Sequence, residues 1–258
     1  MRHLLLSFIV LWVVACKTVE DHSAGVSPAT PDISQELEST IESANAGDPR
    51  AQNLLAINYL YGADGLDEDP QSAYYWFNRS AELGNPYAMS NLGRLYRDGT
   101  GVGQDVSRAK AWFLRAADAG HYQAMSSLGE LFAVGEGVPR DLKQASVWYS
   151  RSVLGPFDPF IANNAAWFFS TVEDEDLLKP ELAINLMLQV VSMRERYYEL
   201  DTLAAAYAAS GDFDNAIYTQ QRALVLGYEG EADEIELGDF EDRLGVYFDR
   251  QRYIFFEN

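Results

Sequence analysis

The chain has 258 residues, of which 48% are hydrophobic and 13% aromatic, so it contains enough apolar material to bury a folded core. Its 39 acidic and 19 basic residues give a formal net charge of −20. This charge argues against nucleic-acid binding, which requires clustered Lys and Arg, and against attachment to anionic lipids through a basic surface.

The first residues are typical of an export signal. Met1-Arg2-His3 precedes the apolar stretch LLLSFIVLWVVA (4–15), which is too short to span a bilayer but suits the apolar region of a signal peptide. We therefore predict a cleaved signal peptide over residues 1–15. The sole cysteine, Cys16, follows directly, and a single cysteine excludes a disulfide bond within the chain.

The residues around this cysteine resemble a bacterial lipobox. Val13-Val14-Ala15-Cys16 has the aliphatic residue, the small residues and the cysteine of that motif. The resemblance implies a lipoprotein with the lipid attached to Cys16, held in the bacterial cell envelope by its acyl chains alone. Lys17 stands where an Asp is associated with inner-membrane retention, which favours the outer membrane, facing the periplasm. The alternative is an ordinary signal peptide with a cysteine at its end.

A segment without periodicity separates this anchor from the folded part. Residues 17–32 read KTVEDHSAGVSPATPD and contain Gly, Ser and two Pro, so we predict a flexible tether over 16–32. Apolar residues then recur on one face from Ile33 to Ala44, which predicts a helix that caps the N-terminal end of the fold, over 33–47.

An internal repeat decides the fold class. Trp76, Trp112 and Trp148 are each 36 residues apart. Other sets keep nearly the same spacing: Ala51, Ala88 and Ala124; Tyr59, Tyr96 and Phe132; Gly65, Gly101 and Gly137; Asp69, Asp105 and Asp141; Ala73, Ala109 and Ala145; Arg79, Arg115 and Arg151.

Each repeat predicts two helices. In the second repeat the first helix covers about Tyr87 to Arg97, and Gly99-Thr100-Gly101 reverses the chain. Asp105 caps the second helix, and Gly120 ends it with a left-handed conformation. The Trp and its aromatic neighbour are expected to fill the space between helices, while the Ala residues let helices approach closely. The recurring Arg is expected to stack on an aromatic ring or to pair with an acidic residue of the adjoining repeat; a row of ligand-binding Arg is the alternative.

The motif A-x3-L-G-x2-Y-x2-G-x-G followed by D-x3-A-x2-W-F-x-R-A-A-x2-G resembles the Sel1-like repeat, and residues 88–120 match it best. The first copy departs by carrying Ala56 where Gly is expected. The resemblance implies an all-α, right-handed helical-repeat solenoid with three Sel1-like repeats over 48–157.

The pattern changes after Pro159. Residues 161–191 and 200–228 resemble tetratricopeptide repeats, the second through Tyr207, Gly211 and Ala216, which predicts two such repeats over 158–228. Residues 229–258 are predicted to form an acidic loop and a C-terminal capping helix at 239–250. About twelve helices are expected in all.

No catalytic or cofactor-binding motif stands out. The histidines, at positions 3, 22 and 121, are too scattered for a metal site or a dyad, and no nucleophile elbow or phosphate-binding loop is present. The acidic runs 173–176 and 229–242 lack the ligand spacing of a calcium loop. We therefore expect no cofactor, no metal and no enzymatic activity; a hydrolase with an unrecognised site is the weaker alternative.

The sequence thus favours a scaffold or adaptor for protein–protein interaction in the envelope, with other envelope proteins as partners. A solenoid presents a surface lined by the first helix of each repeat, and a partner should contact the positions there that vary between repeats. These positions are Asn58, Tyr61, Asn91, Arg94, Arg97, Ser127 and Glu130. The alternative function is a binding module that takes a peptide or a cell-wall fragment (muropeptide) in the same groove.

Overall fold

The computed structural model describes residues 33–135, 137–230 and 232–255. Cys16, the predicted signal peptide and the predicted tether lie outside the described residues. All regular secondary structure in the described part is helical, which confirms the predicted all-α helical-repeat solenoid.

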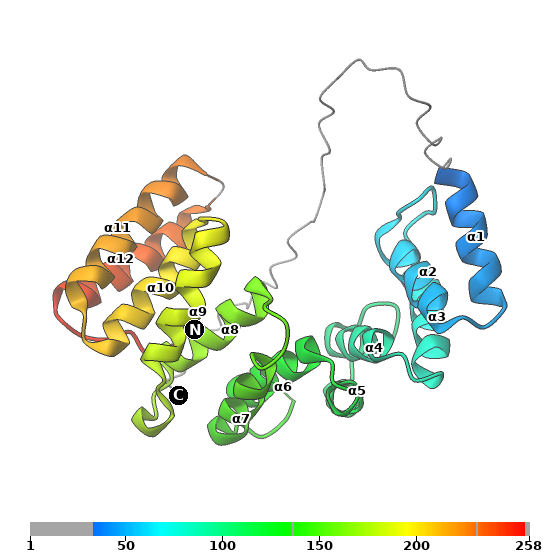
Figure 1. Cartoon of the computed structure of the whole chain (residues 1–258), viewed down its shortest axis with the longest axis horizontal. Helices are drawn as coiled ribbons and strands as arrows, with labels where there is room; N and C mark the ends of the chain where they lie inside the picture. Colours follow the sequence, from blue (N-terminus) through cyan, green and yellow to red (C-terminus); the bar gives the residue numbers. More distant parts are fainter. Residues whose placement is uncertain (1–32, 136, 231, 256–258) are drawn as a thin grey trace, which may run out of the picture. The chain divides into compact units, whose positions relative to one another are not determined.

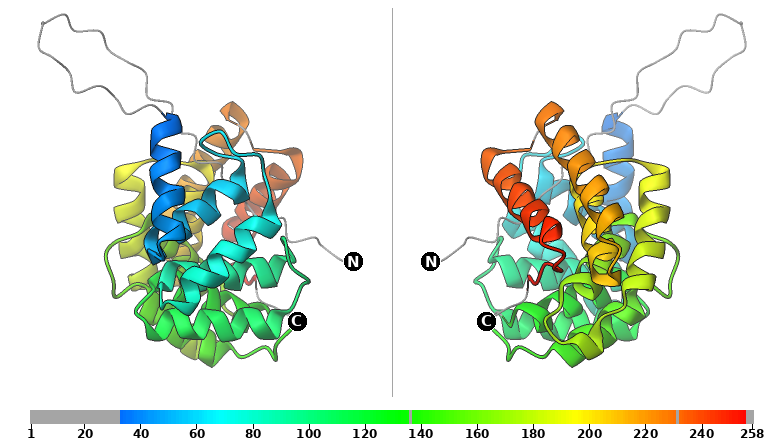
Figure 2. Two further views of the ribbon diagram at one scale, coloured as in Figure 1. Left: turned by 90° about the vertical axis from the view of Figure 1, so that its right-hand side faces the viewer. Right: turned by 90° about the vertical axis from the view of Figure 1, so that its left-hand side faces the viewer.

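Helices that are adjacent in the sequence pack against each other from one end of the array to the other (Figure 1). The first helices α8 and α10 also contact each other directly, and the right-hand view of Figure 2 brings α11 and α12 to the front. The helices are α1 (Ile33–Asn45), α2 (Pro49–Tyr61), α3 (Pro70–Glu82), α4 (Pro86–Asp98), α5 (Val106–Asp118), α6 (Tyr122–Val134), α7 (Leu142–Ser152), α8 (Pro159–Thr171), α9 (Pro180–Met193), α10 (Tyr197–Ser210), α11 (Phe213–Glu229) and α12 (Glu234–Phe248), with a short 3-10 helix at Glu175–Leu177.

In α3, α5 and α7, the second helices of the first three repeats, one aromatic residue fills the space behind the first helix. Phe77 of α3 and Phe113 of α5 are fully buried, and Tyr149 of α7 is 4% exposed. A Cβ atom placed on Gly93 of α4 would lie 2.5 Å from the Phe113 ring. The helix pair is therefore closer than any side chain at this glycine would allow.

The predicted turn between the two helices of a repeat is confirmed. Gly99 and Gly101 both have positive φ angles, +72° and +68°. A Cβ atom on Gly101 would lie 2.1 Å from the carbonyl oxygen of Pro70, which belongs to the preceding repeat. This glycine thus serves both the reversal of the chain and the contact between repeats.

The predicted caps also form. The Asp69 carboxylate accepts hydrogen bonds from the N–H groups of Gln71 and Ser72, both at 3.1 Å, and Pro70 occupies the first helical position. Asp105 accepts from the N–H of Arg108 at 2.9 Å. Gly120 has φ +84°, as the left-handed ending requires.

The last helix begins earlier than the sequence pattern predicted. It covers Glu234–Phe248 rather than 239–250. The reason is a capping box, in which the Asp233 carboxylate accepts from the N–H of Glu236 while the Glu236 side chain accepts from the N–H of Asp233. Four acidic residues, Asp233, Glu234, Glu236 and Asp239, interrupt the apolar pattern in the sequence, although acidic residues favour a helix N-terminus.

Candidate interaction surface

The first helices of the repeats start in the same way, so their side chains can be placed in register. Each of these helices is capped by a side chain that accepts hydrogen bonds from backbone N–H groups of the first turn. The capping residues of α2, α4, α6 and α8 are, in this order, Asp48, Asn85, His121 and Asp158. Residues at equal distance from these caps therefore occupy equivalent positions. The sixth helical residues are Leu54, Asn91, Ser127 and Asn164, and the ninth are Ile57, Arg94, Glu130 and Trp167.

These two rows, together with Tyr61 and Arg97, define what we call the first-helix face. Its members differ from one repeat to the next while the Ala and aromatic positions of the core stay the same. Tyr61 is 55% exposed and Leu54 44%, and Arg94 is also exposed. The face therefore offers apolar and polar side chains of different kinds to a partner.

Polar contacts connect the first helices across this face. The Asn91 Nδ2 atom of α4 donates to Oδ1 of Asn53 in α2 at 3.3 Å. Arg97 of α4 pairs with Glu130 of α6 at 3.3 Å and with Asp98 at 2.8 Å. Such partly exposed ion pairs add little to stability, so an incoming charged group can exchange with them at low free-energy cost.

Not all seven sequence-selected residues reach the surface. Asn58 is 4% exposed, and its side chain donates to the Asp64 carboxylate at 2.8 Å. Ser127 is 9% exposed. We therefore leave Asn58 out of the first-helix face and assign Ser127 only a minor share of it, whereas Tyr61, Arg94 and Glu130 remain accessible.

The sequence reasoning missed Trp167 and Leu54. Both occupy positions equivalent to residues that were selected, Trp167 to Arg94 and Leu54 to Asn91. Extending the register from the shared caps to α8 would have found Trp167, because Pro159 marks the start of α8 just as Pro86 marks the start of α4.

The recurring Arg residues stack on the Trp of their own helix. The Cζ atoms of Arg79, Arg115 and Arg151 lie 5.3, 4.3 and 4.4 Å from the ring centroids of the Trp three residues earlier. The predicted stacking is thus present. In the described part of the chain, none of these three Arg residues forms an ion pair within 4.0 Å. They therefore do not pair with an acidic residue of the adjoining repeat.

Lys179 and Ser150 form the pair that most resembles a catalytic dyad. The Lys179 Nζ atom donates to Ser150 Oγ at 2.7 Å, and Ser150 Oγ donates to the Ser146 carbonyl at 2.7 Å. Burial lowers the pKa of Lys179. However, the serine proton is directed to a backbone carbonyl and the lysine acts as the donor, so the lysine is not placed to remove that proton. The contact instead joins α7 to the start of α9.

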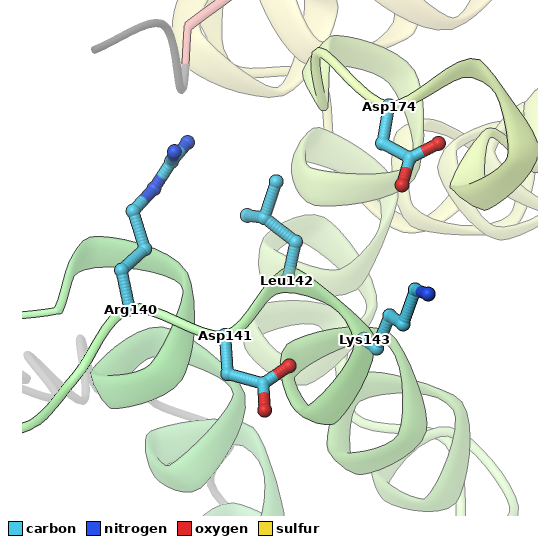
Figure 3. Close-up of a pocket in the computed structure, with 5 residues that line it drawn as sticks. All are labelled: Arg140, Asp141, Leu142, Lys143 and Asp174. Carbon is cyan, nitrogen blue, oxygen red and sulfur yellow. The ribbon is translucent and has the colours of Figure 1, made fainter.

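An open hollow beside α7 also lacks catalytic features. Figure 3 shows its lining residues, Arg140, Asp141, Leu142, Lys143 and Asp174. Asp141 caps α7 through the N–H of Gln144, and Arg140 pairs with Glu173 at 2.8 Å. Asp141 and Asp174 are thus engaged in capping, and Arg140 joins two loops.

Two kinds of feature are absent from the described residues. These residues contain no group of three or more His, Cys, Asp or Glu side chains placed to hold a metal ion. None of the helices at 33–135, 137–230 and 232–255 combines the length and apolar character needed to cross a bilayer.

Comparison with known proteins identifies the repeated unit. A family model of the Sel1 repeat matches residues 49–85, 86–121 and 123–154, which correspond to α2–α3, α4–α5 and α6–α7. The chain contains three Sel1 repeats. Sel1 repeats typically mediate protein–protein interactions, and scaffolds of this kind are generally non-catalytic. No curated protein is similar enough in sequence to be matched to the chain.

Solved structures with Sel1 repeats share the fold. A Sel1 repeat protein from Oxalobacter formigenes is 23% identical, with a TM-score of 0.57, over 81% of this chain and 98% of that one. The protective antigen c5321, present in uropathogenic Escherichia coli strains, is 22% identical with a TM-score of 0.59; the match covers 86% of this chain but only 49% of the antigen. A Sel1 repeat protein from Klebsiella pneumoniae subsp. pneumoniae is 18% identical with a TM-score of 0.50, over 81% and 99% of the two chains.

Proposed function

We propose that the protein is a non-catalytic scaffold that binds other proteins of the bacterial cell envelope through its first-helix face. The observation that carries the proposal is the contrast between invariant packing positions and varied exposed positions on the same helices. Ala88 and Ala124, for example, are fully buried in α4 and α6, while Arg94 and Glu130 of the same helices are exposed and opposite in charge.

The first-helix face suits a protein partner better than a small enclosed ligand. Two open hollows lie elsewhere, one at the start of α7 and one on α11 lined by Tyr218, Arg222 and Val225. The first-helix face, in contrast, presents a row of separate side chains that reaches from α2 to α8. An extended surface of this kind is typical of protein recognition by helical repeats.

The placement in the envelope rests on the sequence. The signal-peptide pattern, the lipobox ending in Cys16 and Lys17 at the following position support an outer-membrane lipoprotein whose folded part faces the periplasm. A polar tether of 16 residues after Cys16 would give the scaffold freedom to reach partners near the membrane.

The proposal is tested by crosslinking and co-purification of the full-length protein from its native envelope. A Cys16→Ala variant, which keeps the folded part unchanged, is the paired control. We expect a defined set of envelope proteins with the lipid-anchored form and a loss of the protein from the outer-membrane fraction in the variant.

Two results would contradict the proposal in different ways. Recovery of no partner protein with either form would contradict the scaffold function. It would favour cell-wall fragments as ligands of the same face. Equal membrane fractionation of the two forms would remove the anchor at Cys16 while leaving partner binding intact.

A further inference from the structure

The segment after α12 folds back onto the end of α8. Arg250 has a left-handed backbone with φ +53°, which is unfavourable for a residue other than glycine and reverses the chain at this point. Residues 251–254 then have no regular secondary structure. We call residues 251–255 the tail.

Hydrogen bonds to backbone carbonyls at the end of α8 hold the tail in place. The last carbonyl groups of a helix have no partner within the helix. Here the N–H of Phe255 donates to the Thr171 carbonyl at 3.1 Å. The guanidinium of Arg252 donates to the carbonyls of Val172 at 3.0 Å and Glu173 at 3.3 Å, and its charge lies at the negative end of the helix dipole.

Two aromatic side chains of the tail contact Trp167. The ring centroids of Tyr253 and Phe255 lie 6.1 and 5.6 Å from that of Trp167. Alternate residues of an extended chain point the same way, so both rings reach one tryptophan. Arg243 of α12 lies beneath, with its Cζ atom 5.6 Å from the Trp167 ring and 5.3 Å from the Tyr253 ring.

Trp167 belongs to the first-helix face, at the position equivalent to Arg94 and Glu130. The tail thus covers one end of the surface that we assign to partners. Its two ends are exposed, at Gln251 and at Phe255 (43%), whereas Tyr253 is half-buried and packs beside Tyr247 of α12. The buried Asp201–Arg243 pair, at 2.7 Å, joins α10 to α12 directly, so α12 is held by more than its contacts with Tyr253 of the tail.

We propose that the surface around Trp167 is a binding site for an extended protein segment that carries an arginine followed by two aromatic residues at alternate positions, and that the tail occupies this site as an internal ligand. The inference rests on the proposed function, because it identifies the sequence chemistry of the partner segment. Binding of a partner then requires displacement of residues 251–255. The acidic residues at 173–176 beside the site favour a basic segment.

The test uses a fluorescently labelled peptide with the sequence of residues 249–255, Asp-Arg-Gln-Arg-Tyr-Ile-Phe, and the full chain. A tail attached to its own site has an effective concentration of about millimolar, so it competes strongly with added peptide. We expect the peptide to bind a chain carrying Tyr253→Ala and Phe255→Ala at least about tenfold more tightly than the unaltered chain. A control peptide with alanine at the positions of Arg252, Tyr253 and Phe255 should not bind.

Equal binding of the peptide to both chains, or equal binding of the two peptides, would overturn the proposal. The helical circular dichroism signal shows whether the altered chain is folded. If it is not, the unaltered chain labelled with nitrogen-15 decides the question: excess unlabelled peptide must shift the Phe255 N–H resonance and speed its hydrogen exchange, and an unchanged resonance at millimolar peptide would refute displacement. This experiment needs no native partner, so its failure leaves the scaffold function itself standing.

Discussion

Gly93 offers the sharpest test of how closely the helices of a repeat pack. In Gly93→Ala the new Cβ atom would lie 2.5, 2.6 and 2.9 Å from three atoms of the fully buried Phe113 ring. Alanine favours the helix over glycine by about 1 kcal/mol, but overpacking of a core typically costs about 1–3 kcal/mol. We therefore expect Gly93→Ala to lower the free energy of unfolding by about 1 kcal/mol.

Gly238 of α12 provides the matched control. It also lies within a helix, but an added Cβ atom would meet no atom within 4 Å. Gly238→Ala should therefore raise the free energy of unfolding by up to about 1 kcal/mol, from helix propensity alone. Urea denaturation followed by tryptophan fluorescence measures both changes, since a shift of the midpoint at constant slope reports stability.

The first repeat shows how the steric conflict should be relieved. Ala56 takes the position of Gly93 there, and both Ala56 and its aromatic partner Phe77 remain fully buried. The conflict at Gly93 is thus with the particular placement of the Phe113 ring, and Phe113→Leu should destabilise the Gly93→Ala chain less than the unaltered chain. A Gly93→Ala chain as stable as the Gly238→Ala chain would contradict a steric conflict with Phe113.

Three further predictions concern single side chains. The His121 Nδ1 atom accepts from the N–H of Ala124 at 3.2 Å, and burial lowers the pKa of this imidazole, so the folded state binds a proton less readily than the unfolded state. The free energy of unfolding should therefore fall as the pH drops below about 6.5. In thermal unfolding measured at different pH values, His121→Asn should abolish this dependence. Arg243→Met leaves the Asp201 carboxylate buried without its charged partner, with the Gln220 amide as its remaining side-chain donor, and should destabilise the chain by about 3 kcal/mol in urea denaturation. Adding Asp201→Asn should restore part of the loss. Arg115→Ala removes a stacked guanidinium 4.3 Å from the Trp112 ring centroid and should cost only about 0.5–1 kcal/mol by the same assay, because that contact is exposed.

Most of the fold was predictable because the same pattern of residues occurs three times in the sequence. The Trp and Gly spacing placed the helix pairs, and the Asp and Pro residues at helix starts placed their first turns. The prediction that 158–228 consists of two tetratricopeptide-like repeats agrees with helix pairs α8–α9 and α10–α11 in its element order, but the Sel1 repeat match ends at residue 154, so the relation to tetratricopeptide repeats stays a prediction.

The tail and its site were not predictable from periodicity, because their contacts join residues about 80 positions apart. Nothing in the local sequence of Arg252 indicates that it binds the carbonyls of Val172 and Glu173. The buried pair of Asp201 and Arg243 was equally hidden, although an aspartate in the apolar stretch LDTLAAAYAA signals a charge that needs a partner. A repeated residue pattern predicts the packing within and between repeats. A contact that occurs only once in the fold leaves no such pattern in the sequence.

Site-specific photo-crosslinking in living cells shows directly whether a partner contacts the first-helix face. Tyr61 of α2 lies on the first-helix face and Tyr75 of α3 does not, and their exposures are nearly equal, at 55% and 52%. Each is replaced in turn by benzoylphenylalanine, a photoreactive residue of similar shape. We expect a discrete crosslinked partner from position 61 and none from position 75. The same adducts from both positions, or adducts from position 75 alone, would contradict the assignment of this face.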